Sequence, residues 1–80
     1  MSWVYLLECS DGTLYCGATT DLEARLKAHN QGKGARYTRN RLPVKLVWSK
    51  ECVSYPNALS EEYRIKRLSR KEKLSLIQNN

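Results

Sequence analysis

The sequence predicts a small α+β domain whose elements follow the order β-β-α-β-α-α. Two features carry this prediction: a pair of β-branched and aromatic segments joined by Ser10-Asp11-Gly12 opens the chain, and helix-capping patterns recur after residue 19. No internal repeat, low-complexity segment or linker interrupts the 80 residues. We therefore expect one domain, residues 1–80, with a small core.

Residues 3–9 and 13–19 are predicted to form a hairpin. A loop of two or four residues would place Tyr5 and Tyr15 on opposite faces. A three-residue loop ending in a left-handed glycine would pair Tyr5 with Gly17 and put both tyrosines on one face. Gly17 would then leave room beside Tyr5 for a backbone or a ligand.

The segment after the hairpin has the pattern of an amphipathic helix. Thr20 and Glu23 form a capping box that predicts a helix from Asp21 through His29. Gly32 is a favourable residue for its C-terminal end, and a basic loop follows.

Pro43 follows the basic loop and is expected to open a third strand over residues 44–50. The alternation of this strand predicts Val44, Leu46 and Trp48 on one face.

Two further capping patterns predict two helices in the last third of the chain. Ser54 can cap the first, with Pro56 near its first turn. Ser69 and Glu72 form a capping box for the second, which is expected to run through Ile77.

The charge of the chain predicts a polyanionic partner. Lys and Arg outnumber Asp and Glu by 14 to 8, a net charge of +6, and no acidic residue occurs between Arg25 and Lys50. A stretch of one sign attracts nucleic acid through its phosphates. No run of 18 apolar residues and no signal-peptide pattern is present, so we expect no membrane association and a cytoplasmic location.

The cysteines argue against a disulfide-stapled secreted protein, because they are three in number and lack a C-x-x-C spacing. A zinc site built from Cys9, Cys16, Cys52 and the single histidine, His29, is formally open. Structural zinc ligands usually occur in pairs at short spacing, which this set lacks.

Two predicted helices carry polar residues on the faces that should meet the core. At 100° per residue, Arg25 and His29 fall in one arc with Leu22 and Leu26, and Glu62 falls within the apolar face of a later helix. Desolvation of such groups costs free energy, so they indicate a functional site. The alternatives are side chains that reach past the core edge to water, or an ion pair between Arg25 and Glu62.

These residues occur as an ordered set along nearly the whole chain. The set comprises Val4-Tyr5-Leu6-Leu7, Tyr15-Cys16-Gly17, Arg25 and His29, then Glu62 followed by Tyr63-Arg64-Ile65-Lys66. It resembles the GIY-YIG nuclease superfamily, in particular its small stand-alone bacterial proteins of unsettled function. Trp3 and Val4 stand where the first motif has Gly and Ile, and Cys16 replaces the Ile of the second, but both tyrosines are retained.

The resemblance implies a fold and an activity. The family fold is a small three-stranded antiparallel sheet flanked by helices, in agreement with the predicted element order. Active members cut DNA phosphodiester bonds with one divalent metal. The resemblance therefore implies a Mg²⁺- or Mn²⁺-dependent endonuclease, structure-selective or otherwise, with a place in DNA repair or recombination.

The same resemblance implies roles for the five site residues. Glu62 would bind the metal, Arg25 would contact the scissile phosphate, and His29 would assist proton transfer. Tyr5 or Tyr15 would position or deprotonate the attacking water, and the resemblance favours Tyr15. One carboxylate is enough for Mg²⁺, which keeps several waters, and a guanidinium matches phosphate geometry. A phenol is a weak base unless Arg25 and the metal favour its phenolate.

The basic loop is expected to bind the nucleic-acid backbone on either side of the cleavage point. The residues expected to make these contacts are Lys33, Arg36, Tyr37, Arg39, Arg41 and Lys45. The later cationic cluster, over residues 64–73, is predicted to be a solvated helix face with some nucleic-acid contact.

Three alternatives compete with the nuclease hypothesis. The first is a nucleic-acid-binding module without catalysis, and the second is an interaction domain for an acidic protein. The third is an enzyme with Cys16 as nucleophile and His29 as base, for which no orienting acid is evident. Because we expect no second domain that could direct the protein to its substrate, we expect a homodimer or a protein partner to supply this targeting.

Overall fold

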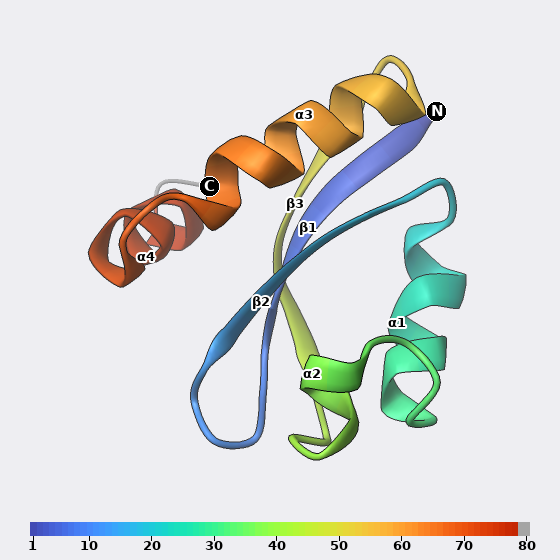
Figure 1. Ribbon diagram of the computed structural model, residues 1–80, viewed down its shortest axis with the longest axis vertical. Helices are drawn as coiled ribbons and strands as arrows, with labels where there is room; N and C mark the ends of the chain where they lie inside the picture. The colour runs from blue at the N-terminus through green and yellow to red at the C-terminus, as the bar shows by residue number, and fades with distance from the viewer. Residues whose placement is uncertain (79–80) are drawn as a thin grey trace.

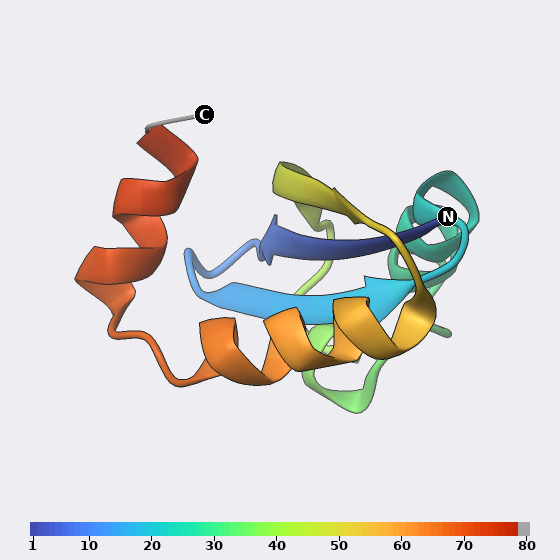
Figure 2. The same cartoon turned by 90° about the horizontal axis from the view of Figure 1, so that it is seen from above.

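The computed structural model describes residues 1–78 and has one three-stranded antiparallel sheet with helices on both faces (Figures 1 and 2). The elements are β1 (Ser2–Glu8), β2 (Leu14–Thr19), α1 (Leu22–Asn30), α2 (Arg36–Arg39), β3 (Lys45–Cys52), α3 (Tyr55–Lys66) and α4 (Arg70–Gln78). The predicted α+β class and element order are confirmed. The one addition is α2, a single helical turn inside the predicted basic loop.

The hairpin has the three-residue loop, so the two alternatives with opposite tyrosine faces are excluded. Gly12 has a φ of +83°, Tyr5 pairs with Gly17 and Leu7 pairs with Tyr15. The glycine supplies the left-handed conformation that this turn needs. Tyr5 and Tyr15 consequently lie on one face of the sheet.

The sheet separates two small cores. One face packs against α3 and α4, and the other packs against α1 and the segment that leads into β3. The first core is built on Val4, Leu6, Cys16, Trp48, Cys52, Ala58 and Ile65. The second is built on Tyr5, Leu7, Cys9 and Val44, with Tyr15, Leu22, Leu26, Leu42 and Leu46 packed against it.

The prediction that Val44, Leu46 and Trp48 share one face was wrong. The register between β1 and β3 shifts by one residue at Val47, which is a β-bulge. A bulge inserts one unpaired residue and so reverses the alternation beyond it. Val44 and Leu46 therefore pack in the second core and Trp48 in the first.

The caps of α3 and α4 are those predicted, whereas the cap of α1 is one residue later. The Ser54 side chain accepts from the Asn57 amide, and Ser69 and Glu72 cap each other's backbone amides. In α1 the Thr20 box is not formed, because the Asp21 carboxylate accepts from the Ala24 amide at 3.1 Å. The helix therefore begins at Leu22.

Gly32 ends α1 in a Schellman motif. Its φ is +78°, its amide donates to the His29 carbonyl, and the Lys33 amide donates to the Ala28 carbonyl, each at 2.9 Å. This arrangement turns the chain back over the end of α1 and brings α2 next to it.

Among the helices of residues 1–78, none combines the length and the apolar character needed to cross a bilayer.

Candidate active site

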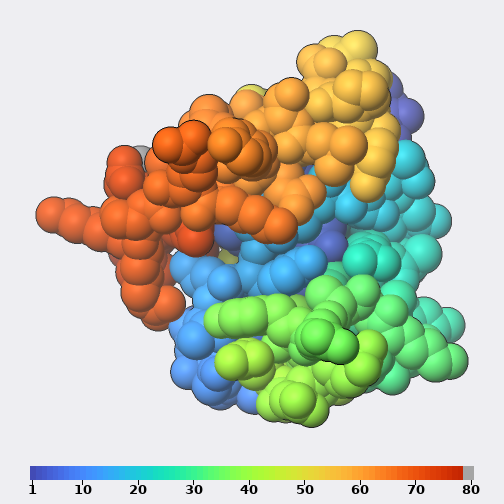
Figure 3. All heavy atoms as spheres, viewed as in Figure 1, coloured from blue at the N-terminus to red at the C-terminus, as the bar shows by residue number. Residues whose placement is uncertain are grey.

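The five candidate side chains lie beside the edge strand β2, with Tyr5 and His29 fully buried and Tyr15, Arg25 and Glu62 partly exposed. Figure 3 shows one face of the molecule: α3, in orange, lies on one side, the loop and α2, in green, lie on the other, and blue strand residues are recessed between them. We call this surface the site groove. Its residues are Tyr5 of β1, Tyr15 of β2, Arg25 and His29 of α1, and Glu62 and Lys66 of α3.

A buried chain of hydrogen bonds runs from Tyr5 through His29 to Thr38. The Tyr5 hydroxyl lies 2.9 Å from His29 Nε2, and His29 Nδ1 lies 2.8 Å from Thr38 Oγ1. The Thr38 hydroxyl donates to the Ala35 carbonyl at 3.1 Å. Its oxygen must therefore accept a proton from His29 Nδ1, which leaves Nε2 free to accept from Tyr5.

Burial keeps both members of the Tyr5–His29 pair neutral. Burial raises the pKa of Tyr5 to about 12, although the adjacent Arg25 guanidinium lowers it in part. Burial, followed by the charge of Arg25, lowers the pKa of His29 to about 4. In the free protein Arg25 alone does not favour the Tyr5 phenolate, because desolvation outweighs the nearby charge.

Two glycines make room for these rings. A Cβ at Gly17 would collide with the Tyr5 hydroxyl, and one at Gly34 would collide with the His29 ring. The space beside Gly17, which the sequence suggested for a backbone or a ligand, is therefore filled by Tyr5 itself.

Arg25 lies half-buried with donors to spare. One terminal nitrogen donates to the Gly34 carbonyl at 3.0 Å, while Nε is buried and has no hydrogen-bond partner among the described residues. A hydrogen bond to the Tyr5 hydroxyl raises the pKa of Arg25, burial opposes this, and the charges of Tyr5 and Tyr15 add to the rise, so the group is cationic throughout. A guanidinium with unused donors fits a phosphate that enters the groove.

Glu62 and its neighbour Glu61 lie on opposite flanks of α3. The Glu62 carboxylate, 18% exposed, contacts the Lys66 ammonium at 2.6 Å. Because its partner is Lys66, the alternative of an ion pair with Arg25 is wrong. Lys66 also lies 5.9 Å from the centre of the Tyr15 ring, which connects α3 to the floor of the groove.

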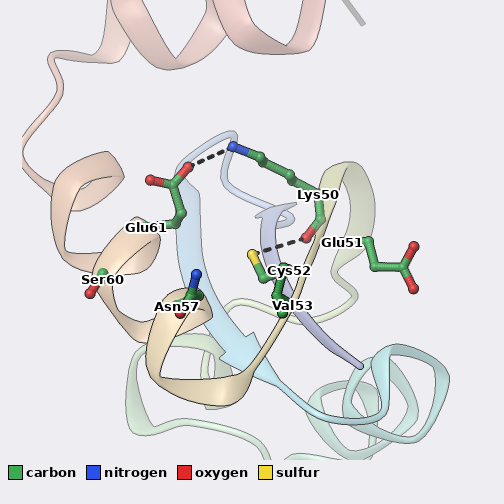
Figure 4. A pocket seen from close by; sticks show the side chains of 7 residues that line it. All are labelled: Lys50, Glu51, Cys52, Val53, Asn57, Ser60 and Glu61. Atoms are coloured by element: carbon green, nitrogen blue, oxygen red, sulfur yellow. Dashed lines mark hydrogen bonds and ion pairs between the residues drawn. The ribbon is translucent and has the colours of Figure 1, made fainter.

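Glu61 belongs to a separate hollow of about 460 Å³ between β3 and α3 (Figure 4). Hydrogen bonds from Arg64 and Lys50 lower its pKa to about 2. Both its oxygens are therefore paired, and this carboxylate has a structural role.

Tyr15 and Tyr37 form part of the groove as stacked rings. Their centres lie 5.9 Å apart with 24° between the planes, and the Tyr15 and His29 ring centres lie 5.3 Å apart in an edge-to-face arrangement. The Arg41 guanidinium lies 4.1 Å from the centre of the Tyr37 ring. Arg41 also pairs with Asp11 at 3.0 Å, so it holds the hairpin turn against α2.

The remaining predicted nucleic-acid contacts lie on the surface. Lys33, Arg36 and Arg39 are exposed and form no ion pair within residues 1–78. Lys45 is exposed and lies 3.5 Å from Glu8 across the sheet.

The described residues contain no cluster of three or more His, Cys, Asp and Glu side chains that could hold a metal. The zinc-site alternative is therefore wrong. Cys16 is also unsuited to nucleophilic attack, because burial and the charge of Glu62 raise its pKa to about 12. Glu62 fits the mode in which Mg²⁺ takes one carboxylate, substrate oxygens and waters, since it is 18% exposed and close enough to Tyr5 for its charge to raise the pKa of that phenol.

His29 should make the stability of the fold depend on pH. In the unfolded chain His29 has a pKa near 6.5, whereas burial in the folded protein lowers its pKa to about 4. The unfolded state therefore binds more protons between these two pH values. The free energy of unfolding should fall by about 2–3 kcal/mol from pH 7 to 4.5. Urea denaturation at several pH values measures this, and a His29→Gln variant serves as the control that lacks the step. A wild-type profile as flat as that of the variant would contradict this prediction.

Sequence reasoning missed two residues of this site. Thr38 carried no signal, because it lies in a segment expected to be a loop. Lys66 was assigned to a solvated face, although its place four residues after Glu62 is the spacing of an ion pair on a helix.

Comparisons with known proteins agree with this geometry. Residues 1–75 match the family model of the GIY-YIG catalytic domain. The UPF0213 protein YsiG of Lactococcus lactis is 58% identical over 78 residues, covering 96% of this chain and 75% of the relative. A UPF0213 protein of Streptococcus sanguinis is 53% identical over 76 residues, with 95% and 87% covered. The solution NMR structure of the UPF0213 protein BH0048 of Bacillus halodurans superposes with a TM-score of 0.64 at 46% identity, covering 100% of this chain and 86% of that one.

Proposed function

We propose that this chain, which belongs to the GIY-YIG family, is a divalent-metal-dependent endonuclease that hydrolyses DNA phosphodiester bonds in the site groove. The observation that carries the proposal is the buried Tyr5–His29–Thr38 hydrogen-bond chain beside an Arg25 with unused donors and the Glu62 carboxylate. Desolvation of these groups costs free energy, and the buried Arg25 Nε recovers none of it through a hydrogen bond among the described residues, which favours a functional role.

Arg25 would bind the scissile phosphate. Its terminal donors beyond the contact to Gly34 could contact non-bridging oxygens, where negative charge grows in the transition state. The contact to the Gly34 carbonyl holds the guanidinium in place beforehand, so little reorganisation is needed when the substrate arrives.

Tyr5 and His29 would take the proton of the attacking water. The Tyr5 hydroxyl already donates to His29 Nε2, and its oxygen, which accepts from Arg25, would keep one lone pair to accept from a water that enters the groove. As the water attacks phosphorus, its proton would pass to Tyr5 while the Tyr5 proton passes to His29. This route avoids a free phenolate, which the raised pKa of Tyr5 disfavours. Tyr15, whose hydroxyl has no such acceptor among residues 1–78, would help to position the water.

Glu62 would hold the Mg²⁺ or Mn²⁺ that GIY-YIG nucleases usually use. When bound, the metal would supply Lewis-acid stabilisation of the phosphoryl and leaving oxygens. Lys66 would then be released from the carboxylate and become available to a substrate phosphate.

The cations around the groove would bind the flanking DNA backbone. Lys33, Arg36 and Arg39 are free for this role, while Arg41, Tyr37 and Lys45 would contribute from the structured parts of the same segment. A cytoplasmic location and a homodimer or targeting protein partner stay predictions from the sequence.

Thr38 should fix the tautomer of His29. A Thr38→Val variant keeps the volume but removes the acceptor of Nδ1–H, so protonation at Nε2 becomes competitive and the acceptor for Tyr5 is lost. We expect cleavage to fall about tenfold and Thr38→Ser to restore it. Because His29 is the only histidine of the chain, the ¹⁵N shifts of its ring in tag-free protein report the tautomer directly. Nδ1 should be protonated in wild type and in the serine variant, and an unchanged tautomer in the valine variant would contradict this role.

A cleavage screen tests the proposed function. Purified protein is incubated with duplex, branched and single-stranded DNA in Mg²⁺, Mn²⁺ or chelator. We expect strand cleavage that requires metal. Salt-sensitive binding without cleavage, indifferent to Glu62 and to chelator, would instead assign a binding module.

A further inference from the structure

One flank of α3 exposes a row of large side chains that the proposed reaction does not use. Tyr55 is 42% exposed, Leu59 44% and Tyr63 66%. They occur at a spacing of four residues, so they lie in a row along one side of the helix, away from the buried Ala58 and Ile65. We call these three residues the α3 stripe.

The α3 stripe lies on the side of the helix that borders the site groove. Glu62 and Lys66 occur on the same flank, and Tyr55 lies close enough to Arg25 to contribute to its raised pKa. The opposite flank carries Asn57, Ser60 and Glu61, which line the hollow beside β3 in Figure 4. A molecule bound along the α3 stripe would therefore pass directly by the candidate metal ligand.

The chemistry around the α3 stripe favours a polyanion with exposed aromatic faces. The Arg67 guanidinium lies 5.5 Å from the centre of the Tyr63 ring and donates to its hydroxyl at 3.2 Å. Further cations follow on the last turn of α3 and on α4. A second copy of this chain docked here would place its own positive charges against them, which is unfavourable. Aromatic rings next to cations are the surface that single-stranded nucleic acids use, through base stacking and phosphate contacts.

We propose that the α3 stripe stacks unpaired bases next to the scissile phosphate, and that the substrate therefore has a single-stranded segment there. In a duplex the base faces are covered by their neighbours, so the rings of Tyr55 and Tyr63 would find no partner. The α3 stripe is about 12 Å long at 1.5 Å per residue, the length of about three or four stacked nucleotides. This inference rests on the proposed function and names the substrate class of the same site.

The test compares single-stranded with duplex binding. Glu62→Gln protein in chelator is titrated by fluorescence anisotropy with a labelled oligothymidine and with a blunt-ended duplex of the same number of phosphates. The substitutions Tyr63→Ala and Tyr55→Ala are introduced into this protein singly and together. Tyr63→Phe, which retains the aromatic ring, is a further variant. Val53→Ala, at an exposed residue outside the α3 stripe, is the surface control.

Each alanine variant should weaken oligothymidine binding by about tenfold, and the double variant should weaken it further. Tyr63→Phe and Val53→Ala should change it by less than about twofold, and binding to the blunt-ended duplex should be similarly unaffected in all variants, because phosphate contacts carry it. An oligonucleotide with 5-iodouracil should crosslink to Tyr63 or Tyr55 on irradiation. Thermal melts check that each variant is folded, as expected for exposed positions.

Equal losses on both ligands, or no loss on either, would overturn the proposal. If the alanine variants bind normally while the wild type still cleaves with metal and needs Glu62, only the role of the α3 stripe is wrong. If the wild type binds no nucleic acid at low salt, the proposed function fails too. Sedimentation that shows a dimer lost on Tyr63→Ala would assign the α3 stripe to self-association instead.

Discussion

Replacement of Glu62 by glutamine is expected to abolish cleavage and to leave nucleic-acid binding intact. The carboxamide keeps the shape of the side chain but is neutral, so it is a poor ligand for a hard divalent cation. Loss of the metal should lower the single-turnover rate by about a thousandfold or more. Affinity for DNA in chelator should stay equal or rise, since one negative charge leaves the groove and Lys66 is released.

Glu61→Gln is the matched control for this change. It is the same substitution one residue earlier, on the opposite flank of α3, where the carboxylate pairs with Lys50 and Arg64. It should cost some stability and leave the cleavage rate within about twofold, because surface ion pairs contribute little. If both variants lose cleavage equally, or if neither does, Glu62 has no special role.

Arg25→Lys should show the second largest effect. A lysine keeps the positive charge but loses the planar set of donors, including the buried Nε, so its contacts to the phosphoryl oxygens are fewer and less directed. We expect kcat to fall by about 10²- to 10³-fold with little change in KM, because the lost contacts form mainly in the transition state.

Arg36→Lys on α2 is the control, since this residue is exposed and without an ion pair in the described part of the chain. It should leave kcat within about twofold, because a phosphate contact at the surface is mainly one of charge. A rise in KM at constant kcat for Arg25→Lys would show that Arg25 only binds substrate.

Helix periodicity was enough to find three polar members of the site, although not Lys66. Arg25, His29 and Glu62 stood out because each falls on a face that apolar residues should occupy. The hairpin register needed one more fact, the loop length, which the glycine of the turn allowed but did not require. Once that length is known, strand alternation places Tyr5 and Tyr15 together.

The properties that escaped prediction depend on contacts between elements distant in sequence. The bulge at Val47 depends on how β3 pairs with β1. The residues of β3 alone do not encode this register. The acceptor of His29 is Thr38, nine residues away, and it reaches the ring only because the chain turns back after α1. Likewise, the protonation of Tyr5 follows from how deeply the fold buries it, which outweighs the neighbouring Arg25.

The most direct test of the central claim is a metal titration of the single-turnover cleavage rate. Wild-type protein and Glu62→Gln protein, prepared in parallel, are assayed on DNA that carries a duplex and a single-stranded arm. We predict cleaved product only with the wild type and only with Mg²⁺ or Mn²⁺, with a rate that saturates as one metal binds and disappears on chelation. No product from the wild type at any metal concentration, or equal product from both proteins, would contradict the assignment of this groove as a nuclease active site.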